Sequence, residues 1–323
     1  MTKTYYDHDG DIAFPDGKRI GIIGYGNQGR AQALNMRDSG ISGILIATAK
    51  DETYDQAVKD GFQLTDISAI TKQSDILFLL IPDEIMPGVY EEHIAPHLRP
   101  GMVLNFASGY NITFRQIIPP DDVDVIMVAP RMIGDGVRSL FLEKKGYPAF
   151  IAVEQNASGS AREIALALAK AMGAASIEVT MKDETMLDLL AEQAIWPMII
   201  SVITEAFKFE VEKGHPAEAS LVELYISREP AYMFAKMAEM GLFKQMPLHS
   251  HTSQYGQMSR AEALDKSFIR KTLENAYNYL EKGGFAREWK EEQEKGMPEF
   301  KRLWKNAKES EISRLEEKII NKF

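Results

Sequence analysis

The sequence predicts an α/β protein with a Rossmann-type, mostly parallel sheet in its N-terminal part, followed by an all-α C-terminal part. Short apolar, β-branched runs alternate with helical stretches in the first half of the chain. Long helical patterns fill the second half, where no convincing strand follows Asp183. These observations place a boundary near residue 181, with an α/β domain at 1–181 and an all-α domain at 182–323.

The expected elements follow from apolar runs and helix-ending signals. Strands are expected at 19–24, 43–48, 75–81, 102–107, 124–129, 147–153 and 175–179. Helices are expected at 29–38, 161–174, 183–213, 217–241, 259–282 and 296–320, the last of them amphipathic. Pro197 is expected to kink the helix in which it lies.

Composition narrows the class of protein. The chain has 323 residues, no cysteine and a net charge of -10. Disulfides and thiolate metal sites are therefore excluded, and the negative charge disfavours nucleic acid and anionic membranes as partners. The N-terminus shows no secretory signal, and the most apolar stretch, Met186 to Phe207, is interrupted by charges and a proline. A cytoplasmic protein is expected.

A glycine-rich turn follows the first expected strand. The turn is Gly24-Tyr25-Gly26-Asn27-Gln28-Gly29, which fits G-x-G-x-x-G and opens an expected helix. Gly24 permits the tight turn, Gly26 lets the backbone approach a pyrophosphate, and Gly29 lets the helix pack on the strand. The alternative is a glycine turn without a ligand. The strand-turn-helix context favours a dinucleotide site.

The end of the second strand should distinguish NADP from NAD. Thr48, Lys50 and Thr53 carry groups that hold a 2′-phosphate, whereas Asp51 or Glu52 would oppose it. The sequence favours NADP over NAD by a small margin and leaves both open.

Two carboxylates interrupt an apolar helical pattern. Asp188 and Glu192 are four residues apart in MLDLLAEQAIW, which places both on one helix face. Burying two charges is costly unless a partner compensates them, and Mg²⁺ typically takes one or two carboxylates. The alternative is a solvent-facing or salt-bridged pair.

Several segments together resemble ketol-acid reductoisomerase of the short class. They are YYDHDGD, IGIIGYGNQGRAQALNMRDSG, KDGF, LLIPDE, FASGYNI, PPDDVDVIMVAP, KDETMLDLLAEQA and HTSQYG, in the order of the family and nearly end to end. The resemblance implies a dinucleotide-binding N-domain, a knotted helical C-domain, an active site between them and a homodimer. It also implies two Mg²⁺ ions that promote alkyl migration in a ketol acid before NADPH reduces the new ketone.

The resemblance also assigns site residues. Asp188 and Glu192 match the metal-binding pair, Glu229 matches a glutamate of a later helix, and Ser250 matches the serine that contacts the substrate carboxylate. Pro82 of LLIPDE, Ser108 and Gly134 are expected to line the coenzyme site.

Three positions depart from the family pattern. Ser108 stands in place of a catalytic histidine, Arg131 in place of a lysine, and Tyr225 in place of a metal-binding glutamate one turn before Glu229. Tyrosine is no ligand for a hard cation at neutral pH, and serine does not act as an imidazole-type acid or base. Arg131 offers a fixed, bidentate grip on a carboxylate.

These departures lead to a first hypothesis and two alternatives. The first is an NAD(P)-dependent oxidoreductase that reduces a small, carboxylate-bearing 2-oxo acid or imine without alkyl migration. In it, Asp188 and Glu192 hold one Mg²⁺ or relay protons without a metal. The second is a genuine Mg²⁺-dependent ketol-acid reductoisomerase, and the third is a non-catalytic dinucleotide-binding protein.

Overall fold

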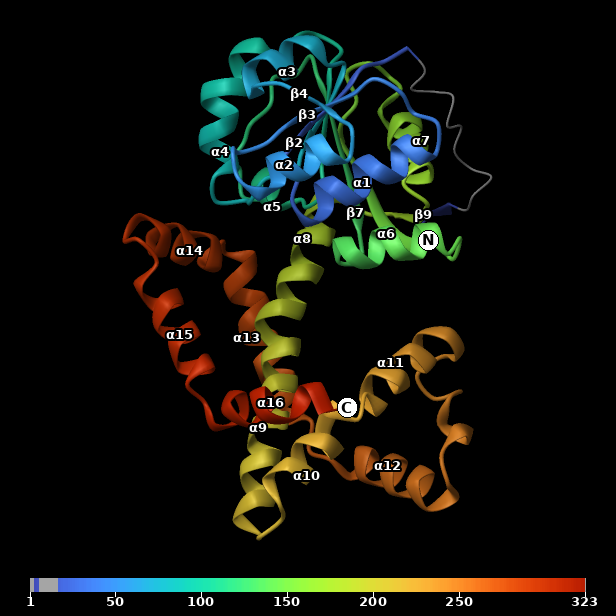
Figure 1. Cartoon of the computed structure of the whole chain (residues 1–323), viewed down its shortest axis with the longest axis vertical. Coiled ribbons are helices and arrows are strands. Elements are labelled where there is room, and N and C mark those ends of the chain that lie inside the picture. Colours follow the sequence, from blue (N-terminus) through green and yellow to red (C-terminus); the bar gives the residue numbers. More distant parts are fainter. Residues whose placement is uncertain (1–2, 6–16, 323) are drawn as a thin grey trace. The chain divides into compact units, whose positions relative to one another are not determined.

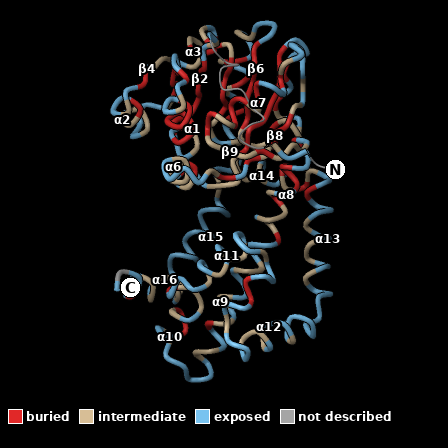
Figure 2. The backbone as a smooth tube through the Cα atoms, turned by 90° about the vertical axis from the view of Figure 1, so that its right-hand side faces the viewer, coloured by how far each residue is buried: buried red, intermediate tan, exposed pale blue. Residues whose placement is uncertain are grey.

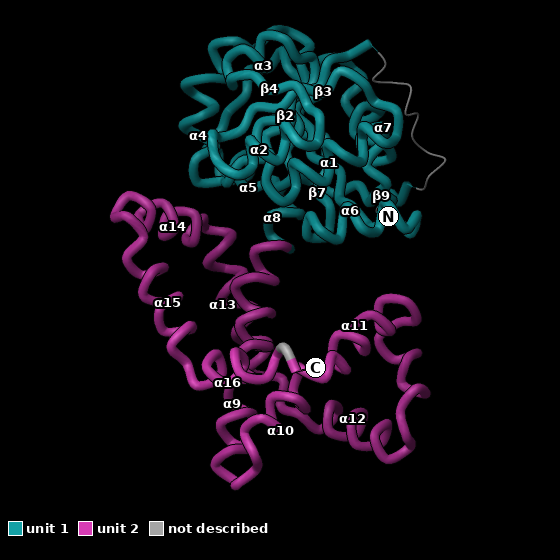
Figure 3. Tube along the Cα trace, in the orientation of Figure 1, with its two compact units in different colours: residues 1–187 teal, residues 188–323 magenta. Residues whose placement is uncertain are grey.

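The chain forms two compact units in the computed structural model, Met1–Leu187 and Asp188–Phe323 (Figure 3). The structure describes residues 3–5 and 17–322. Most of the YYDHDGD segment therefore lies outside the described residues. Each unit is considered by itself below.

Within its described residues, the first unit is built on a nine-stranded sheet with the order β1-β9-β8-β7-β6-β5-β2-β3-β4. The strands are β1 (Thr4–Tyr5), β2 (Ile20–Ile23), β3 (Ile44–Ala47), β4 (Gln63–Leu64), β5 (Ile76–Leu79), β6 (Val103–Phe106), β7 (Asp124–Pro130), β8 (Tyr147–Gln155) and β9 (Ala174–Glu178). Pairing is parallel except between β7 and β8 and between β1 and β9. The predicted mostly parallel sheet is confirmed.

Helices cover both faces of this sheet (Figure 1). They are α1 (Asn27–Asp38), α2 (Glu52–Lys59), α3 (Ile67–Gln73), α4 (Met86–Val89) with turns η1 (Tyr90–Ile94) and η2 (Ala95–His97), α5 (Tyr110–Thr113), α6 (Gly134–Leu142) and α7 (Ala161–Ala171). Residues of α1, α2 and α7 share one buried cluster with one face of the sheet. Residues of α3 and η1 share a second cluster with the other face. Two full apolar layers therefore fix the strands.

The strand order reverses between β2 and β5. The chain leaves β2 toward β3 and β4 on one side and returns through β5 to β6 and β7 on the other. In open α/β sheets, ligands bind at the carboxyl ends of strands beside such a switch point. The glycine turn follows β2, so the topology places it there.

The described residues of the second unit form helices and connecting turns, without a strand. The helix α8 (Met181–Leu190) leads into it and continues as η3 (Ala191–Ile195) and α9 (Trp196–Glu212). The others are α10 (Ala217–Leu221), η4 (Val222–Ile226), α11 (Glu229–Met240), η5 (Met246–Leu248), α12 (His251–Ala263), α13 (Ser267–Glu281), α14 (Gly284–Glu294), α15 (Pro298–Lys308), α16 (Glu311–Ile319) and η6 (Ile320–Lys322).

Some expected boundaries were wrong. The expected helix 259–282 is divided between α12 and α13, and the expected helix 296–320 is divided between α15 and α16. Ser310 causes the second division, because its hydroxyl accepts a hydrogen bond from the Ser313 amide and caps α16. A π-helical turn, η3, directly precedes α9, whose first turn contains Pro197. Such a turn is a recognised cause of a helix bend.

The two units differ in burial (Figure 2). The strands of the first unit are largely buried, whereas much of the second unit is exposed. The segment Met181–Glu212 is long and apolar enough to cross a membrane by length and composition alone, with a mean hydropathy of 1.5, and 17% of its most apolar window is buried. Its apolar surface is therefore largely uncovered within one copy of the chain.

Candidate functional site

The glycine turn lies at the carboxyl ends of β2 and β5. The Gly24 amide donates to the Ala47 carbonyl at 2.8 Å, and the Leu80 amide donates to the Ile23 carbonyl at 2.8 Å. Gly24 has a φ of +100°, and a Cβ there would collide with the Leu80 carbonyl. A Cβ on Gly29 would collide with the Gly24 carbonyl. Both positions therefore require glycine for the fold itself.

Gly26 differs from these two glycines, because a Cβ built on it meets open space. Gly26 precedes α1, and no side chain caps the start of that helix. The first-turn amides therefore have no capping side chain and are available as donors for an anion. This geometry fits a dinucleotide pyrophosphate, as the motif predicts.

The segment after β7 closes one side of the turn. The Gln28 amide group donates to the Met132 carbonyl at 2.9 Å. A Cβ on Gly134 would collide with the Asn27 carbonyl, so α6 begins in direct contact with the glycine turn. The expected coenzyme residues of the turn and Gly134 are thus brought together. Pro82 follows the neighbouring strand β5 and is exposed.

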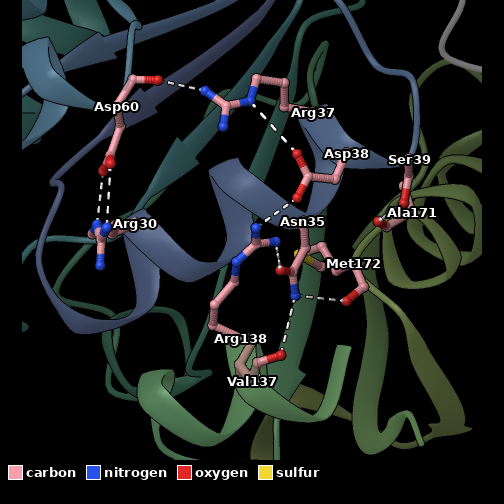
Figure 4. Close-up of polar contacts among 10 residues, drawn as sticks. All are labelled: Arg30, Asn35, Arg37, Asp38, Ser39, Asp60, Val137, Arg138, Ala171 and Met172. Carbon is pink, nitrogen blue, oxygen red and sulfur yellow. Dashed lines mark hydrogen bonds and ion pairs between the residues drawn. The ribbon is translucent and has the colours of Figure 1, made fainter. Parts of the chain in front are cut away.

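A cavity of about 440 Å³ opens in front of this turn. It is lined by Tyr25, Gly26, Asn27, Arg30, Ala31, Leu34, Glu52, Thr53, Gln56, Gly134, Asp135 and Arg138. Both arginines are already engaged (Figure 4): Arg30 is paired with Asp60 at 2.7 Å and Arg138 with Asp38 at 2.6 Å. The cavity therefore carries no strong excess of positive charge from them.

Asp60 also determines the orientation of Tyr25. The Tyr25 hydroxyl donates to Asp60 at 2.9 Å, and its ring packs edge-on against Phe62. The hydrogen bond from Arg30 is the main cause that lowers the pKa of Asp60 to about 2. Burial is the main cause that raises the pKa of Tyr25 above its ordinary value. Because its side chain is 2% exposed, Tyr25 offers mainly its backbone to a ligand.

The strand β6 and helix α8 bring together a second group of polar residues. Glu184, on α8, is 1% exposed, and its carboxylate accepts from Arg131 at 3.0 Å and from the Gly109 amide at 2.8 Å. The Arg131 guanidinium also lies over the Phe150 ring, 5.0 Å from its centroid. The Ser108 hydroxyl accepts from the Tyr110 amide at 3.3 Å. Arg131 is thereby held in one orientation beside the end of β6.

Sequence reasoning missed Glu184. The signal was present, because Glu184, Asp188 and Glu192 form a series of acids at four-residue spacing along an otherwise apolar stretch. Residues at four-residue spacing lie along one face of a helix, so Glu184 could have been counted as a candidate site residue together with Asp188 and Glu192.

The acid pair of the second unit does not lie as expected. Asp188 is half-buried in α8 and Glu192 is exposed in the π-helical turn η3. The expectation that apolar surroundings bury both charges is wrong for a single copy, because this segment is largely uncovered. Their donor chemistry still fits Mg²⁺, a hard cation that accepts one or two carboxylates and retains water. The described residues contain no group of three or more His, Cys, Asp or Glu that could hold a metal.

The structure gives the other expected residues of this unit definite local roles. The Tyr225 hydroxyl donates to Glu316 at 2.6 Å, and burial, followed by this bond, raises the pKa of Tyr225. Glu229 is exposed at the first residue of α11, after Arg228 in a left-handed conformation (φ 65°). Tyr225 and Glu229 therefore lie on separate helices. Ser250 caps α12 by accepting from the Ser253 amide.

The fold and the turn together define a class: a dinucleotide-binding domain of the Rossmann type joined to a helical domain. Two family models match this chain. One is the NADPH-binding domain of acetohydroxy acid isomeroreductase, over residues 15–177, and the other is the C-terminal domain of ketol-acid reductoisomerase, over residues 181–323. The chain belongs to the ketol-acid reductoisomerase family, as the sequence motifs predicted, and it is an NAD(P)-dependent oxidoreductase.

Individual relatives agree with the family models. A relative from Saccharolobus solfataricus whose name includes ketol-acid reductoisomerase 3 is 43% identical over 94% of this chain and 93% of its own length. Ketol-acid reductoisomerase (NADP(+)) of Pyrococcus abyssi is 38% identical over 98% of this chain and 96% of its own length. The structure of an NADH-preferring ketol-acid reductoisomerase from an uncultured archean is 34% identical, with a TM-score of 0.94 over 99% of both chains.

These similarities bear on the hypotheses drawn from the sequence. The predicted oxidoreductase class is confirmed. The relatives favour the alternative, a genuine ketol-acid reductoisomerase, over the first hypothesis of reduction without alkyl migration.

Proposed function

We propose that this chain is an NAD(P)H- and Mg²⁺-dependent ketol-acid reductoisomerase. One observation carries the proposal: both family domains match in order along nearly the whole chain, and the acid pair Asp188 and Glu192 is retained. When bound, the dinucleotide supplies hydride and Mg²⁺ supplies Lewis acidity.

The chain's own residues would bind and orient the reactants. Gly26 and the first amides of α1 hold the pyrophosphate of the coenzyme. Arg131, fixed by Glu184 and Phe150, presents its guanidinium to the carboxylate of the substrate. Asp188 and Glu192 provide oxygen ligands for one Mg²⁺, and Ser250 remains an expected contact of the substrate carboxylate.

The role of Arg131 can be tested through its partner. Glu184→Gln removes the charge but keeps an acceptor for the Gly109 amide. We expect KM for the ketol-acid substrate to rise about tenfold, because a loosened guanidinium loses bidentate binding. Dissociation constants of NADH and NADPH should stay unchanged. An unchanged KM in a folded variant would show that Arg131 does not bind the carboxylate of the substrate.

A second candidate is reduction without alkyl migration, and a specific observation favours it. Two of the three departing residues have partners other than a metal: Arg131 pairs with Glu184, and Tyr225 bonds to Glu316. Ser108 supplies no imidazole at the third position. A chain altered in this way could retain hydride transfer while losing the rearrangement.

Two substrates separate the candidates. The first is 2-acetolactate, which must rearrange before its reduction can give 2,3-dihydroxy-3-methylbutanoate, and the second is the rearranged ketone, 3-hydroxy-3-methyl-2-oxobutanoate. Formation of 2,3-dihydroxy-3-methylbutanoate from both substrates, with Mg²⁺ and reduced coenzyme, supports the reductoisomerase. Formation of this product from the second substrate alone supports the reductase, and coenzyme oxidation on neither substrate, with the coenzyme bound, contradicts both.

We further propose that the protein works as a cytoplasmic homodimer. The second unit exposes large apolar side chains, among them Phe243 (72%), Tyr255 (71%) and Phe268 (70%). Surfaces of this kind mark sites of protein association. Light scattering after size exclusion should give at least twice the chain mass of 36.3 kDa. A monomer that stays soluble at micromolar concentration would contradict the proposal.

A further inference from the structure

The loop between β3 and α2 borders two cavities of the first unit. Thr53 lines the cavity in front of the glycine turn. Thr48 and Lys50 line a neighbouring cavity of about 510 Å³. In a Rossmann domain, the segment after the second strand faces the adenosine ribose of the coenzyme. The loop 48–53 is thus the part of this chain that meets either a ribose 2′-hydroxyl or a 2′-phosphate.

The hydroxyl groups of this loop form a directed chain of hydrogen bonds. The Thr53 hydroxyl donates to Asp51 Oδ1 at 2.6 Å, and the Thr53 amide donates to the same oxygen at 2.9 Å. The hydroxyls of Thr48 and Thr53 are 2.7 Å apart. Because the Thr53 proton is used on Asp51, Thr48 must be the donor in that contact. Neither threonine has a hydroxyl proton left for a phosphate.

Asp51, in contrast to the two threonines, can interact with a ribose hydroxyl as an acceptor. Both hydrogen bonds that Thr53 donates to this side chain end on Oδ1, so Oδ2 can accept from a ribose hydroxyl. Its hydrogen bonds with Thr53 lower the pKa of Asp51, which is therefore charged at neutral pH. A 2′-phosphate is a pure acceptor and negatively charged, so it would meet a carboxylate rather than donors.

The nearby cations do not make the loop favourable for a 2′-phosphate. Arg30 is held by both oxygens of Asp60, and Arg138 by Asp38. Glu52 adds a further negative charge to the same cavity. Lys50 is exposed and is the remaining cation of the loop.

We infer that Asp51 makes this chain prefer NADH to NADPH by accepting from the ribose diol and repelling a 2′-phosphate. The inference rests on the proposed coenzyme site and departs from the NADPH named for the family domain. It reverses the small preference for NADP drawn from the sequence, because Thr48 and Thr53, counted there as phosphate ligands, are committed to each other and to Asp51.

The test is direct binding to the full-length protein without substrate. Dissociation constants of NADH and NADPH are measured by nicotinamide fluorescence or calorimetry at fixed ionic strength. We expect NADH to bind about tenfold more tightly, the scale of one repulsive contact. Asp51→Asn keeps a residue that caps α2 well and removes the charge. It should tighten NADPH about tenfold and change NADH less than threefold.

A matched control lies in the second unit. Asp265 makes a similar turn, accepting from the amide of Ser267 at Oδ1 (2.9 Å) and from its hydroxyl at Oδ2 (2.8 Å). Asp265→Asn therefore removes a charge from a similar turn at the start of a helix and should change neither dissociation constant. Lys50→Met should weaken the binding of NADPH by a smaller factor than the factor by which Asp51→Asn strengthens it. Melting temperatures establish that the variants are folded.

Each outcome is decisive. Wild-type protein that binds NADPH as tightly as NADH overturns the inference, and so does an Asp51→Asn variant with an unchanged preference. These two results leave the proposed coenzyme site intact, because a dinucleotide still binds. Failure of both dinucleotides to bind overturns the inference and the coenzyme part of the proposed function together.

Discussion

The two units of this protein bury their apolar residues to very different extents. In the first unit, two large clusters of buried side chains enclose the sheet from both faces. In the second unit, one cluster has only Phe207, Leu221, Ile226 and Ile319 as buried members, and many large apolar side chains are exposed. The first unit therefore brings the glycine turn, the start of α6 and the adjoining cavity together within one chain. The second unit begins with Asp188 and Glu192, the acids proposed to bind Mg²⁺, on a segment that is largely uncovered.

The largest expected effect is a loss of turnover caused by a substitution in the second unit that leaves coenzyme binding by the first unit unchanged. Glu192→Gln replaces a carboxylate with a neutral amide and should lower kcat about 1000-fold, because a hard cation loses a charged ligand. Dissociation constants of NADH and NADPH should change less than twofold, because the coenzyme contacts belong to the first unit. Turnover is followed by coenzyme oxidation over a series of Mg²⁺ concentrations. A variant with normal kcat would exclude Glu192 as a ligand.

The next prediction compares a buried aromatic side chain of the first unit with an exposed one of the second unit. Phe78, on β5, is fully buried, and Phe78→Ala should lower the free energy of unfolding by about 3–5 kcal/mol. Phe268, on α13, is 70% exposed, and Phe268→Ala should cost the isolated chain less than about 0.5 kcal/mol.

Urea denaturation at two protein concentrations separates these cases. The stability lost in Phe78→Ala should be the same at both concentrations. Any loss in Phe268→Ala should grow with protein concentration, since it would arise from association. A large loss that is independent of concentration would show that Phe268 belongs to a core within one chain.

A smaller effect is expected within the glycine turn. Gly26→Ala adds a methyl group to open space, so the melting temperature should hardly change. Dinucleotide affinity should fall about 10- to 100-fold, because the methyl group occupies the approach of the pyrophosphate. Gly29→Ala is the contrasting variant, since its methyl group collides with the Gly24 carbonyl and should lower stability as well. Equal melting temperatures for the two variants would contradict this distinction.

The smallest effect is a pH dependence of stability. Asp60 has a pKa of about 2 in the folded chain, below its ordinary value of about 3.9. Its contribution is therefore complete above about pH 4 and is lost as the pH falls toward 2. Because the side chain of Arg30 is 46% exposed, solvent screening reduces the contribution to about 1 kcal/mol.

Asp60→Asn should remove this part of the acid dependence and leave the rest. The free energy of unfolding is measured from pH 2 to pH 6 for both proteins. If the two curves stay parallel over that range, Asp60 does not stabilise the fold through its charge.

The sequence predicted the first unit better than the second, for a physical reason. Buried parallel strands appear as continuous apolar runs, so β2, β3, β5 and β6 were found within a residue or two. The strands β1 and β4 have two residues each and depend on pairing with a neighbour, which no local pattern reveals. In the second unit, helix ends are set by single residues such as Met297, whose φ is 60°.

Within the candidate site, too, some features were predictable from the sequence and others were not. The glycine turn was predictable because the spacing of its glycines marks positions at which a side chain would collide with the backbone. The directions of side-chain hydrogen bonds were not predictable, so the hydrogen bonds that join Thr48 to Thr53 and Thr53 to Asp51 are visible only in the structure. The pairing of Arg131 with Glu184 joins residues 53 apart in the chain, and no spacing rule covers that separation.

Product analysis with isotope-labelled 2-acetolactate tests the central claim most directly. The substrate carries ¹³C in the methyl group on C2 and is incubated with the protein, Mg²⁺ and both reduced coenzymes. A reductoisomerase moves the label to C3 and yields 2,3-dihydroxy-3-methylbutanoate, which ¹³C NMR identifies. If the label stays on C2, whether the substrate is untouched or is reduced at its existing ketone, the proposed function is wrong.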